Sequence, residues 1–192
     1  FVTVLNRNDK PDAFDDSTSV FEDSSVVVDV LVNDVDIDGD SLTVSISSQP
    51  AFGVLTLKDN KLIYTPKANY CGPDSFGYTI TGGNGDAKCP GEQSFAKALV
   101  FVNVICVNDP PVIPDTLVRV PEDSVITLCV PYTDNDSNDI HDLSICGLPA
   151  HGTLGNTLVL DNATRTVCLT YKPDTNFNGI DSLCVIVCDN GT

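Results

Sequence analysis

Apolar and polar residues alternate along most of the chain, and no stretch shows a sustained helical period. The clearest alternation lies at Val26 to Val30, Leu42 to Ile46, Phe76 to Ile80 and Leu99 to Phe101. Such a period of two predicts β-strands with one face in a core. We take Val26, Val28 and Val30, and likewise Leu99 and Phe101, as members of strand faces, and we expect the aromatic residues mostly at core positions. Clusters of Gly and Pro between these segments predict turns.

The sequence repeats itself with a period of about 100 residues. FVTVLNRNDKP, from Phe1, returns as FVNVICVNDPP from Phe101, and Glu-Asp-Ser at Glu22 returns at Glu122. YTP..NYCGPDSF, from Tyr64, returns later in the chain as YKP..NFNGIDSL. Several short strands in a repeat of this length are typical of an antiparallel β-sandwich. The sequence therefore predicts an all-β protein of tandem sandwich repeats.

The matching segments also predict where the repeats begin and end. Residues 1–7 correspond to the last strand of a preceding repeat, residues 8–107 to a complete repeat, and residues 108–192 to a repeat that lacks its final strand. We expect the chain to be an internal segment of a longer protein. We also expect an open sheet edge in the second repeat, to be covered by the next repeat or by a strand from another chain.

The composition excludes some partners and indicates a compartment. The chain has 27 Asp and Glu against 10 Lys and Arg, which gives a net charge of −17. Nucleic acids and anionic membranes are therefore unfavourable partners, because both bind through Lys and Arg. Eight cysteines without a CxxC pair favour disulfides in an oxidising compartment. We expect an extracellular protein at the cell surface. No apolar run is long enough for a transmembrane helix.

An acidic loop in the first repeat suggests a metal site. Asp34, Asp36, Asp38 and Asp40 alternate with other residues, and Gly39 permits a sharp turn. Calcium takes six to eight oxygen ligands, so clustered carboxylates suit it. The alternative is a solvated polar turn, in which Asp and Gly are also common. Acidic residues recur at the same place in the second repeat, at Asp134 and Asp136, and this recurrence favours calcium.

A series of motifs gives the chain a family resemblance. In order they are N-D-x-P, V-x-E-D, D-V-L-V-N-D-x-D-x-D-G-D, P-x-x-G-x-L, Y-T-P and N-Y-x-G-x-D-S-F-x-Y-T. This pattern resembles the cadherin-like repeats of giant bacterial surface adhesins, and it spans nearly the whole chain. The resemblance implies tandem cadherin-like, Ig-like antiparallel β-sandwiches with Greek-key connections. The second acidic loop departs from the pattern because it lacks the glycine.

The resemblance also implies calcium ions shared between successive repeats. Carried over position by position, the ligands of one junction are Glu22, Asp74, Asn108, Asp109, Asp134, Asp136 and Asp189. Those of the preceding junction are Asn8, Asp9, Asp34, Asp36 and Asp38, with Gly82 in the place of Asp189. Further candidates are Asp15, Asp16, Glu122 and Asp181. Bound calcium would offset the repulsion among these carboxylates and hold neighbouring repeats at a fixed angle.

Strand order in a cadherin-like sandwich implies a disulfide scheme. Alternation along the strands directs Cys129, Cys146, Cys168 and Cys184 away from the core. The second and fifth strands of such a sandwich are neighbours, as are the third and sixth. The scheme pairs Cys129 with Cys168, Cys146 with Cys184, Cys106 with Cys188, and Cys71 with Cys89.

Together these observations predict a calcium-rigidified stalk segment of a large secreted surface adhesin or fibre, whose partners are neighbouring repeats of the same chain. The alternative is a glycan- or protein-binding module attached to a secreted multidomain protein or enzyme. We do not expect catalysis by the repeats, because no G-x-S-x-G, H-E-x-x-H or P-loop motif occurs. The two histidines, His141 and His151, are too few for a zinc site without cysteines, and His151 is expected to be structural.

Overall fold

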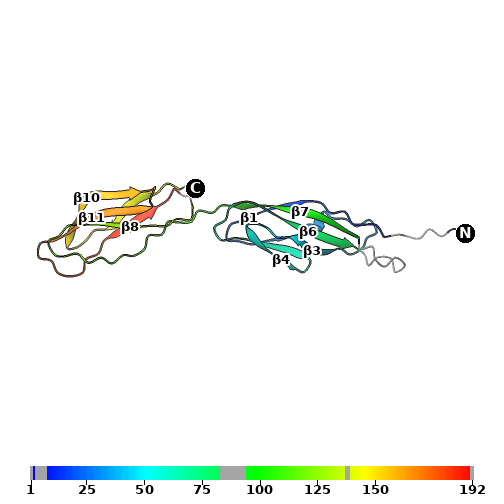
Figure 1. The fold of residues 1–192 in the computed structure, drawn as a ribbon, viewed down its shortest axis with the longest axis horizontal. Coiled ribbons are helices and arrows are strands. Elements are labelled where there is room, and N and C mark those ends of the chain that lie inside the picture. The colour runs from blue at the N-terminus through cyan, green and yellow to red at the C-terminus, as the bar shows by residue number, and fades with distance from the viewer. Residues whose placement is uncertain (1, 3–7, 83–93, 137–138, 191–192) are drawn as a thin grey trace. The chain divides into compact units, whose positions relative to one another are not determined.

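The computed structural model of the chain describes residue 2 and residues 8–82, 94–136 and 139–190. It divides into unit 1, Phe1–Val107, and unit 2, Asn108–Thr192 (Figure 1). Apart from Val2, the strand expected over residues 1–7 lies outside the described residues. Within the described ranges, the regular elements are β-strands and one 3-10 helix, η1 (Val30–Val32). No helix in these ranges is long and apolar enough to cross a bilayer.

Unit 1 is a two-sheet β-sandwich. Its strands are β1 (Asp16–Phe21), β2 (Val26–Val28), β3 (Thr43–Ser48), β4 (Gly53–Lys58), β5 (Lys61–Pro66), β6 (Gly72–Gly82) and β7 (Ser94–Ile105). One sheet has the order β1-β7-β6-β3 and the other the order β2-β5-β4. Strands β1 and β7 are parallel, whereas the other neighbours are antiparallel. The core between the sheets is built from alternate residues, with Tyr64, Phe76 and Tyr78 among its largest members.

The structure corrects the predicted faces of two strands. On β7 the core residues are Val100, Val102 and Val104, whereas Leu99 and Phe101 are 43% and 49% exposed. Both faces of β7 carry apolar side chains, so alternation alone could not distinguish the inner face from the outer one. In the segment from Val26, the strand ends at Val28 and η1 follows, although Val30 is still fully buried.

Aromatic residues are less concentrated in the core than predicted. Several phenylalanines of unit 1 are more than two-fifths exposed, namely Phe14, Phe21, Phe52, Phe95 and Phe101. Phe95 and Phe101 belong to the outward face of β7, and Phe52 stacks on Tyr70 with ring centroids 4.4 Å apart. Aromatic side chains of this unit therefore lie on its surface as well as in its core.

Unit 2 contains five strands in the described residues. They are β8 (Ile126–Pro131), β9 (Asp142–Gly147), β10 (Gly152–Asp161), β11 (Thr166–Pro173) and β12 (Cys184–Cys188). They form the sheets β10-β11-β8 and β12-β9. The order β10-β11-β8 repeats β4-β5-β2 of unit 1, and the pair β12-β9 repeats β6-β3. No described residue of unit 2 forms a strand in the place of β1 or β7.

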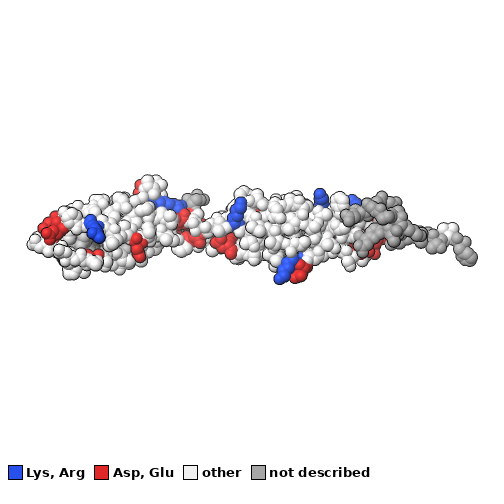
Figure 2. Space-filling view, turned by 60° about the horizontal axis from the view of Figure 1, so that its bottom comes forward, with Lys and Arg blue, Asp and Glu red and all other residues white. Residues whose placement is uncertain are grey.

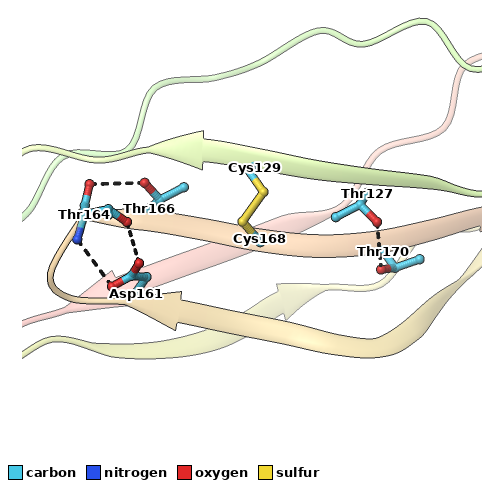
Figure 3. The surroundings of a disulfide bond; sticks show 7 residues. All are labelled: Thr127, Cys129, Asp161, Thr164, Thr166, Cys168 and Thr170. Atoms are coloured by element: carbon cyan, nitrogen blue, oxygen red, sulfur yellow. Dashed lines mark hydrogen bonds between the residues drawn. A yellow bond between two sulfur atoms is a disulfide. The ribbon is translucent and has the colours of Figure 1, made fainter.

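Two disulfides of unit 2 agree with the strand-based scheme. Cys129 on β8 lies directly opposite Cys168 on β11, and the two are bonded. Figure 3 shows this bond across the two strands, beside the contact between Thr127 and Thr170. Cys146 and Cys184 join β9 to β12 with their Cα atoms 5.0 Å apart. Alternating side chains thus place each pair on the outer face of a sheet.

The other two predicted pairings are wrong, because Cys106 is bonded to Cys71 within unit 1. Strand β6 begins at Gly72, which lies opposite Val104 of β7. Cys71 and Cys106 therefore flank the same end of this ladder, with their Cα atoms 4.9 Å apart. Cys188 has an exposed free thiol, and Cys89 lies outside the described residues.

Candidate metal centre

Three carboxylates of unit 2 converge just after strand β8. Asp134, Asp136 and Asp139 each offer an oxygen, and these oxygens lie within 4.8 Å of one another. All three residues are half-buried. Such close carboxylates repel one another unless a cation or hydrogen-bond donors compensate their charge. An all-oxygen donor set of this kind suits a hard divalent cation such as calcium.

Hydrogen bonds fix the shape of this loop and bring the start of the unit to it. The backbone N–H of Asp136 donates to Asp134 Oδ1 at 2.7 Å. The backbone N–H of Asp109 donates to Asp136 Oδ2 at 2.7 Å, and Asn135 Nδ2 donates to Asp109 Oδ2 at 3.1 Å. A fourth carboxylate, that of Asp109, therefore lies beside the cluster.

Asn108 and Asp189 extend the oxygen-rich region. The side-chain amide of Asn108 donates to both carboxylate oxygens of Asp189, at 3.3 and 3.2 Å. Its own carbonyl oxygen, Oδ1, is buried without a hydrogen-bond partner. A buried carbonyl oxygen without a donor is unfavourable in an empty site and becomes favourable as a cation ligand. The structure thus brings together the five unit 2 residues predicted from the sequence, Asn108, Asp109, Asp134, Asp136 and Asp189.

Three further side chains pack against or bind the acidic loop: those of His141, Tyr132 and Arg165. His141 Nε2 lies 2.6 Å from Asp134 Oδ2, and both side chains are almost fully buried. The ring of Tyr132 packs edge-on against His141 with centroids 4.9 Å apart. Arg165 donates to the backbone carbonyls of Asp134 and Asp136. The guanidinium therefore holds the backbone of the loop through these two carbonyl oxygens.

Sequence reasoning missed two of these contributors. Asp139 belongs to the same acidic run as Asp134, so the sequence carried a signal for it. Arg165 is distant in sequence and reaches the loop only because the turn between β10 and β11 lies beside it. The partner of His141 is Asp134, a residue of the acidic loop.

Unit 1 repeats the hydrogen bonds of this loop with different residues. The backbone N–H of Asp38 donates to Asp36 Oδ1 at 2.9 Å, and that of Asp9 donates to Asp38 Oδ2 at 2.6 Å. Asp36 and Asp38 therefore occupy the places of Asp134 and Asp136 in unit 2. The predicted equivalence of Asp34 with Asp134 is wrong by two residues, because the first loop is longer. The isolated β-bridges give the same alignment. Val35, just before Asp36, pairs with Asp12, and Thr133, just before Asp134, pairs with Val112.

Asp34 has a structural role inside unit 1. It is buried, and it accepts hydrogen bonds from the backbone of Phe14 at 2.8 Å and from the hydroxyl of Tyr78 at 3.0 Å. Burial raises the pKa of Asp34, and these two hydrogen bonds lower it by less. Asp34 therefore ties the segment before β1 to β6, and it lies outside the loop geometry of Asp36 and Asp38.

The end of unit 1 that contains Asp36 has fewer acidic groups. Asn8 Nδ2 donates to Ser94 Oγ at 3.0 Å, whereas the equivalent Asn108 donates to a carboxylate. A side chain on Gly82 would collide with Asp36 Oδ2, so no acidic residue fits there in this arrangement. Asp36 Oδ2 is itself buried without a hydrogen-bond partner. At position 82 this end of unit 1 therefore lacks the carboxylate that Asp189 provides in unit 2, and the group of three close carboxylates in unit 2 has no counterpart among the described residues of unit 1.

Glu22 and Asp74 lie within unit 1, each with its own partners. Glu22 is buried, and its Oε1 accepts the backbone N–H of Val107 at 2.5 Å. Asp74 accepts hydrogen bonds from Ala51 N, Phe52 N, Ser75 N and the hydroxyl of Tyr64. These bonds hold the turn before β4 against β6, so we assign Asp74 a structural role in place of the predicted ligand role.

The further candidates also have local roles. Asp181 repeats the role of Asp74, because it accepts Ala150 N, His151 N, Ser182 N and the hydroxyl of Tyr171. Asp15 accepts the backbone N–H of Leu99 at 2.8 Å. Burial raises the pKa of Asp16, and Glu122 is exposed.

Asp181 should make unit 2 sensitive to acid. Burial raises its pKa, but the four hydrogen bonds lower it more, so the folded-state pKa lies below the ordinary value of an aspartate. The stabilisation is therefore present above the unfolded-state pKa and is lost as the pH falls through the folded-state pKa. We expect melting curves between pH 7 and pH 2 to show this loss for the natural chain. Asp181→Asn should be less stable at pH 7 and should lack this part of the acid dependence; an unchanged acid dependence would contradict the assignment.

The model of the family described as "Bacterial Ig domain" matches residues 8–89 and 108–192. The chain belongs to the bacterial Ig domain family. Each match covers one repeat, and the two-sheet sandwich of unit 1 and the two sheets of unit 2, each with a disulfide between neighbouring strands, are the folds expected of Ig-like, cadherin-like repeats. The three disulfides among the described residues indicate an oxidising, extracellular environment.

Among curated proteins, this bacterial Ig domain chain is similar to Protein GAMETE EXPRESSED 2 of Arabidopsis thaliana. The two are 41% identical over 104 residues, which cover 54% of this chain and 10% of the plant protein. The chain therefore spans about a tenth of the length of this relative.

Solved structures with a similar chain trace include cadherin ectodomains. Human desmocollin-1 matches with a TM-score of 0.48 and 16% identity, over 95% of this chain and 38% of that one. Drosophila N-cadherin EC1-4 matches with a TM-score of 0.47 and 17% identity, over 92% and 44%. Human protocadherin-24 EC1-2 matches with a TM-score of 0.45 and 21% identity, over 91% and 83%.

Proposed function

We propose that these bacterial Ig domain repeats form a structural spacer of an extracellular adhesin or fibre, and that each repeat binds calcium at its acidic loop. The observation that carries the proposal is the convergence of Asp134, Asp136 and Asp139 within 4.8 Å. The same hydrogen-bonded loop recurs in unit 1, at Asp36 and Asp38. A site used once for catalysis would have no reason to recur, whereas a site that stiffens a repeat would recur in each one.

The ligands available to calcium differ between the two repeats. In unit 2 they are the carboxylates of Asp109, Asp134, Asp136 and Asp139, with the free carbonyl oxygen of Asn108. In unit 1 they are those of Asp9, Asp36 and Asp38. Fewer charged ligands generally give weaker calcium binding. We therefore expect tighter binding in unit 2.

Calcium should stabilise unit 2 and protect its acidic loop. A ligand that binds only the folded state stabilises it by about 2.7 kcal/mol at a hundred times its dissociation constant. For a repeat of this size, that shift should raise the melting temperature by roughly 10 °C or more. Hydrogen exchange of residues 139–142 should slow when calcium is added and recover with chelator. Asp136→Asn should weaken binding at least tenfold.

Asp115→Asn provides the matched control, because Asp115 is exposed and lies outside the cluster. It removes the same charge and should leave calcium binding unchanged. Equal responses of the two variants would indicate a general effect of charge. An unchanged melting temperature and unchanged exchange in the natural chain would reject the calcium site and with it the proposed stiffening.

The exposed apolar face of β7 favours a second candidate function, a protein-binding module. Leu99, Phe101 and Ile105 lie on this face, and Phe21 lies opposite Ile105 on β1. Contiguous apolar surface of this kind often marks an interaction site. On the side drawn in Figure 2, charged side chains form small groups among wide uncharged areas. An affinity that depends on Phe101 and is unaffected by chelator would favour this function.

A further inference from the structure

A buried imidazole lies directly against the acidic loop of unit 2. His141, just before β9, is only 3% exposed, and its Nε2 lies 2.6 Å from Asp134 Oδ2. Its other ring nitrogen, Nδ1, is buried and has no hydrogen-bond partner among the described residues. An ionised carboxylate can only accept a hydrogen bond, so the hydrogen lies on Nε2. Within the part of the chain that the structure describes, the ring therefore makes its one hydrogen bond to a residue of the acidic cluster.

Hydrogen bonds hold the carboxylate of Asp134 at both of its oxygens. This side chain is fully buried. Oδ1 accepts the backbone N–H of Asp136 at 2.7 Å, and Oδ2 accepts the bond from His141. Each carboxylate oxygen has two lone pairs, so both can still bind a cation. The two hydrogen bonds thus fix the orientation of the carboxylate and leave it able to act as a ligand.

Unit 1 offers an internal comparison, because it has the same loop without the imidazole. Leu42, just before β3, stands in the place of His141. The side-chain amide of Asn60, in the turn between β4 and β5, donates to Leu42 O at 2.8 Å. That of Asn162, in the turn between β10 and β11, donates to His141 O at 3.5 Å. Leu42 and His141 are therefore equivalent in the fold as well as in the sequence.

The carboxylate of Asp36 shows the effect of this difference. Its Oδ1 accepts the backbone N–H of Asp38 at 2.9 Å, which repeats the bond in unit 2. Its Oδ2 is buried and has no hydrogen-bond partner in the described part of the chain. A Cβ on Gly82 would touch both this oxygen and Leu42 Cδ2. An apolar side chain thus lies beside the oxygen whose counterpart in unit 2 is bonded to an imidazole.

We propose that His141 is a positioning residue of the calcium site in unit 2: its imidazole holds Asp134 in the orientation that binds the cation, and unit 1 lacks this support because Leu42 takes its place. The inference rests on the calcium binding proposed above. A carboxylate that is already held loses less side-chain freedom when it binds a cation. Groups that orient a metal ligand typically contribute about tenfold to a hundredfold to metal affinity.

The test is a calcium titration of the full chain followed by NMR. The backbone amides of Asp136 and Asp38 report the two sites separately, because each donates to a carboxylate of its own loop. His141→Leu, which places the unit 1 residue in unit 2, should weaken calcium binding in unit 2 about tenfold and leave unit 1 unchanged. His151→Leu is the matched control, since it makes the same substitution at an exposed histidine of unit 2 and should bind like the natural chain.

Melting in chelator separates positioning from a purely structural role. All titrations are run at a temperature at which circular dichroism shows the variant to be folded without calcium. His141→Gln keeps an N–H donor and should recover part of the affinity that His141→Leu loses. A purely structural histidine would lower the melting temperature in chelator and leave the calcium affinity of the folded chain unchanged. That outcome, tighter binding by His141→Leu, or equal losses in the two variants would overturn the proposal.

The reciprocal variant, Leu42→His, decides the matter if the His141 variants do not fold. It places a donor beside Asp36 Oδ2 and should tighten calcium binding in unit 1 roughly threefold or more, with unit 2 unchanged. Unchanged binding in unit 1 would then overturn the proposal. If neither amide of the natural chain responds to calcium, the proposed function fails and this inference fails with it. If the natural chain responds and His141→Leu binds equally well, only the positioning role fails.

Discussion

Asp74→Ala should lower the free energy of unfolding of unit 1 by about 3 to 5 kcal/mol, because it removes the acceptor of one buried and three partly buried hydrogen bonds. Asp74 is buried, and it accepts hydrogen bonds from two backbone groups of the turn before β4, from Ser75 N and from Tyr64. The hydroxyl of Tyr64 lies in the core, where no water replaces the lost partner. Because the chain has no Trp, circular dichroism during denaturant unfolding is the suitable measurement.

Tyr64→Phe is the graded control for this prediction. It removes only the hydroxyl and leaves the backbone donors on Asp74, so a loss of about 1 kcal/mol is expected. The loss caused by Asp74→Ala should be the same with calcium and with chelator, since the role is structural. A loss that appears only when calcium is present would instead restore Asp74 to the set of ligands.

Replacing both Cys71 and Cys106 with serine should lower the stability of unit 1 by about 4 kcal/mol. The bond joins residues 35 positions apart, and closing a loop of this length restricts the unfolded chain by about that amount. Urea unfolding of the variant, followed by circular dichroism, would measure the difference.

Cys188→Ser serves as the control, because Cys188 has a free and exposed thiol. It should leave the unfolding of both units unchanged. Peptide mapping of the natural chain without reduction should recover the Cys71–Cys106 peptide. Recovery of Cys106 bonded to Cys188 would contradict the structure of unit 1.

The β-sandwich repeats could be predicted from the sequence because alternation and repetition constrain them directly. The cysteines of unit 2 could also be paired, since Cys129, Cys146, Cys168 and Cys184 all lie within strands whose order follows from the fold. Cys71 and Cys106 lie just outside the ends of β6 and β7. Their pairing depends on where the ladder begins, which alternation does not determine.

The acidic loops show a second limit of sequence comparison. The sequence landmarks aligned Asp34 with Asp134, but the hydrogen bonds align Asp36 with Asp134. Two extra residues in the first loop move the alternating aspartates by one full period, so the pattern looks the same in either alignment. Asp74 likewise had the right residue type for a ligand. Its role depends on the donors around it, and two of these come from a turn more than twenty residues away.

The Cys71–Cys106 bond also determines how unit 1 would respond to tension along the chain. Force that enters at the amino end of the unit passes along the chain to Cys71, crosses the sulfur atoms to Cys106 and leaves at Val107. Strands β6 and β7 lie between the two cysteines and outside this covalent path. At about 3.5 Å per extended residue, the 35 residues between the two cysteines correspond to roughly 12 nm of chain that cannot be extended while the disulfide is intact. A pulled unit 1 would therefore lengthen by that much less when it unfolds, and chemical reduction would release the stored length.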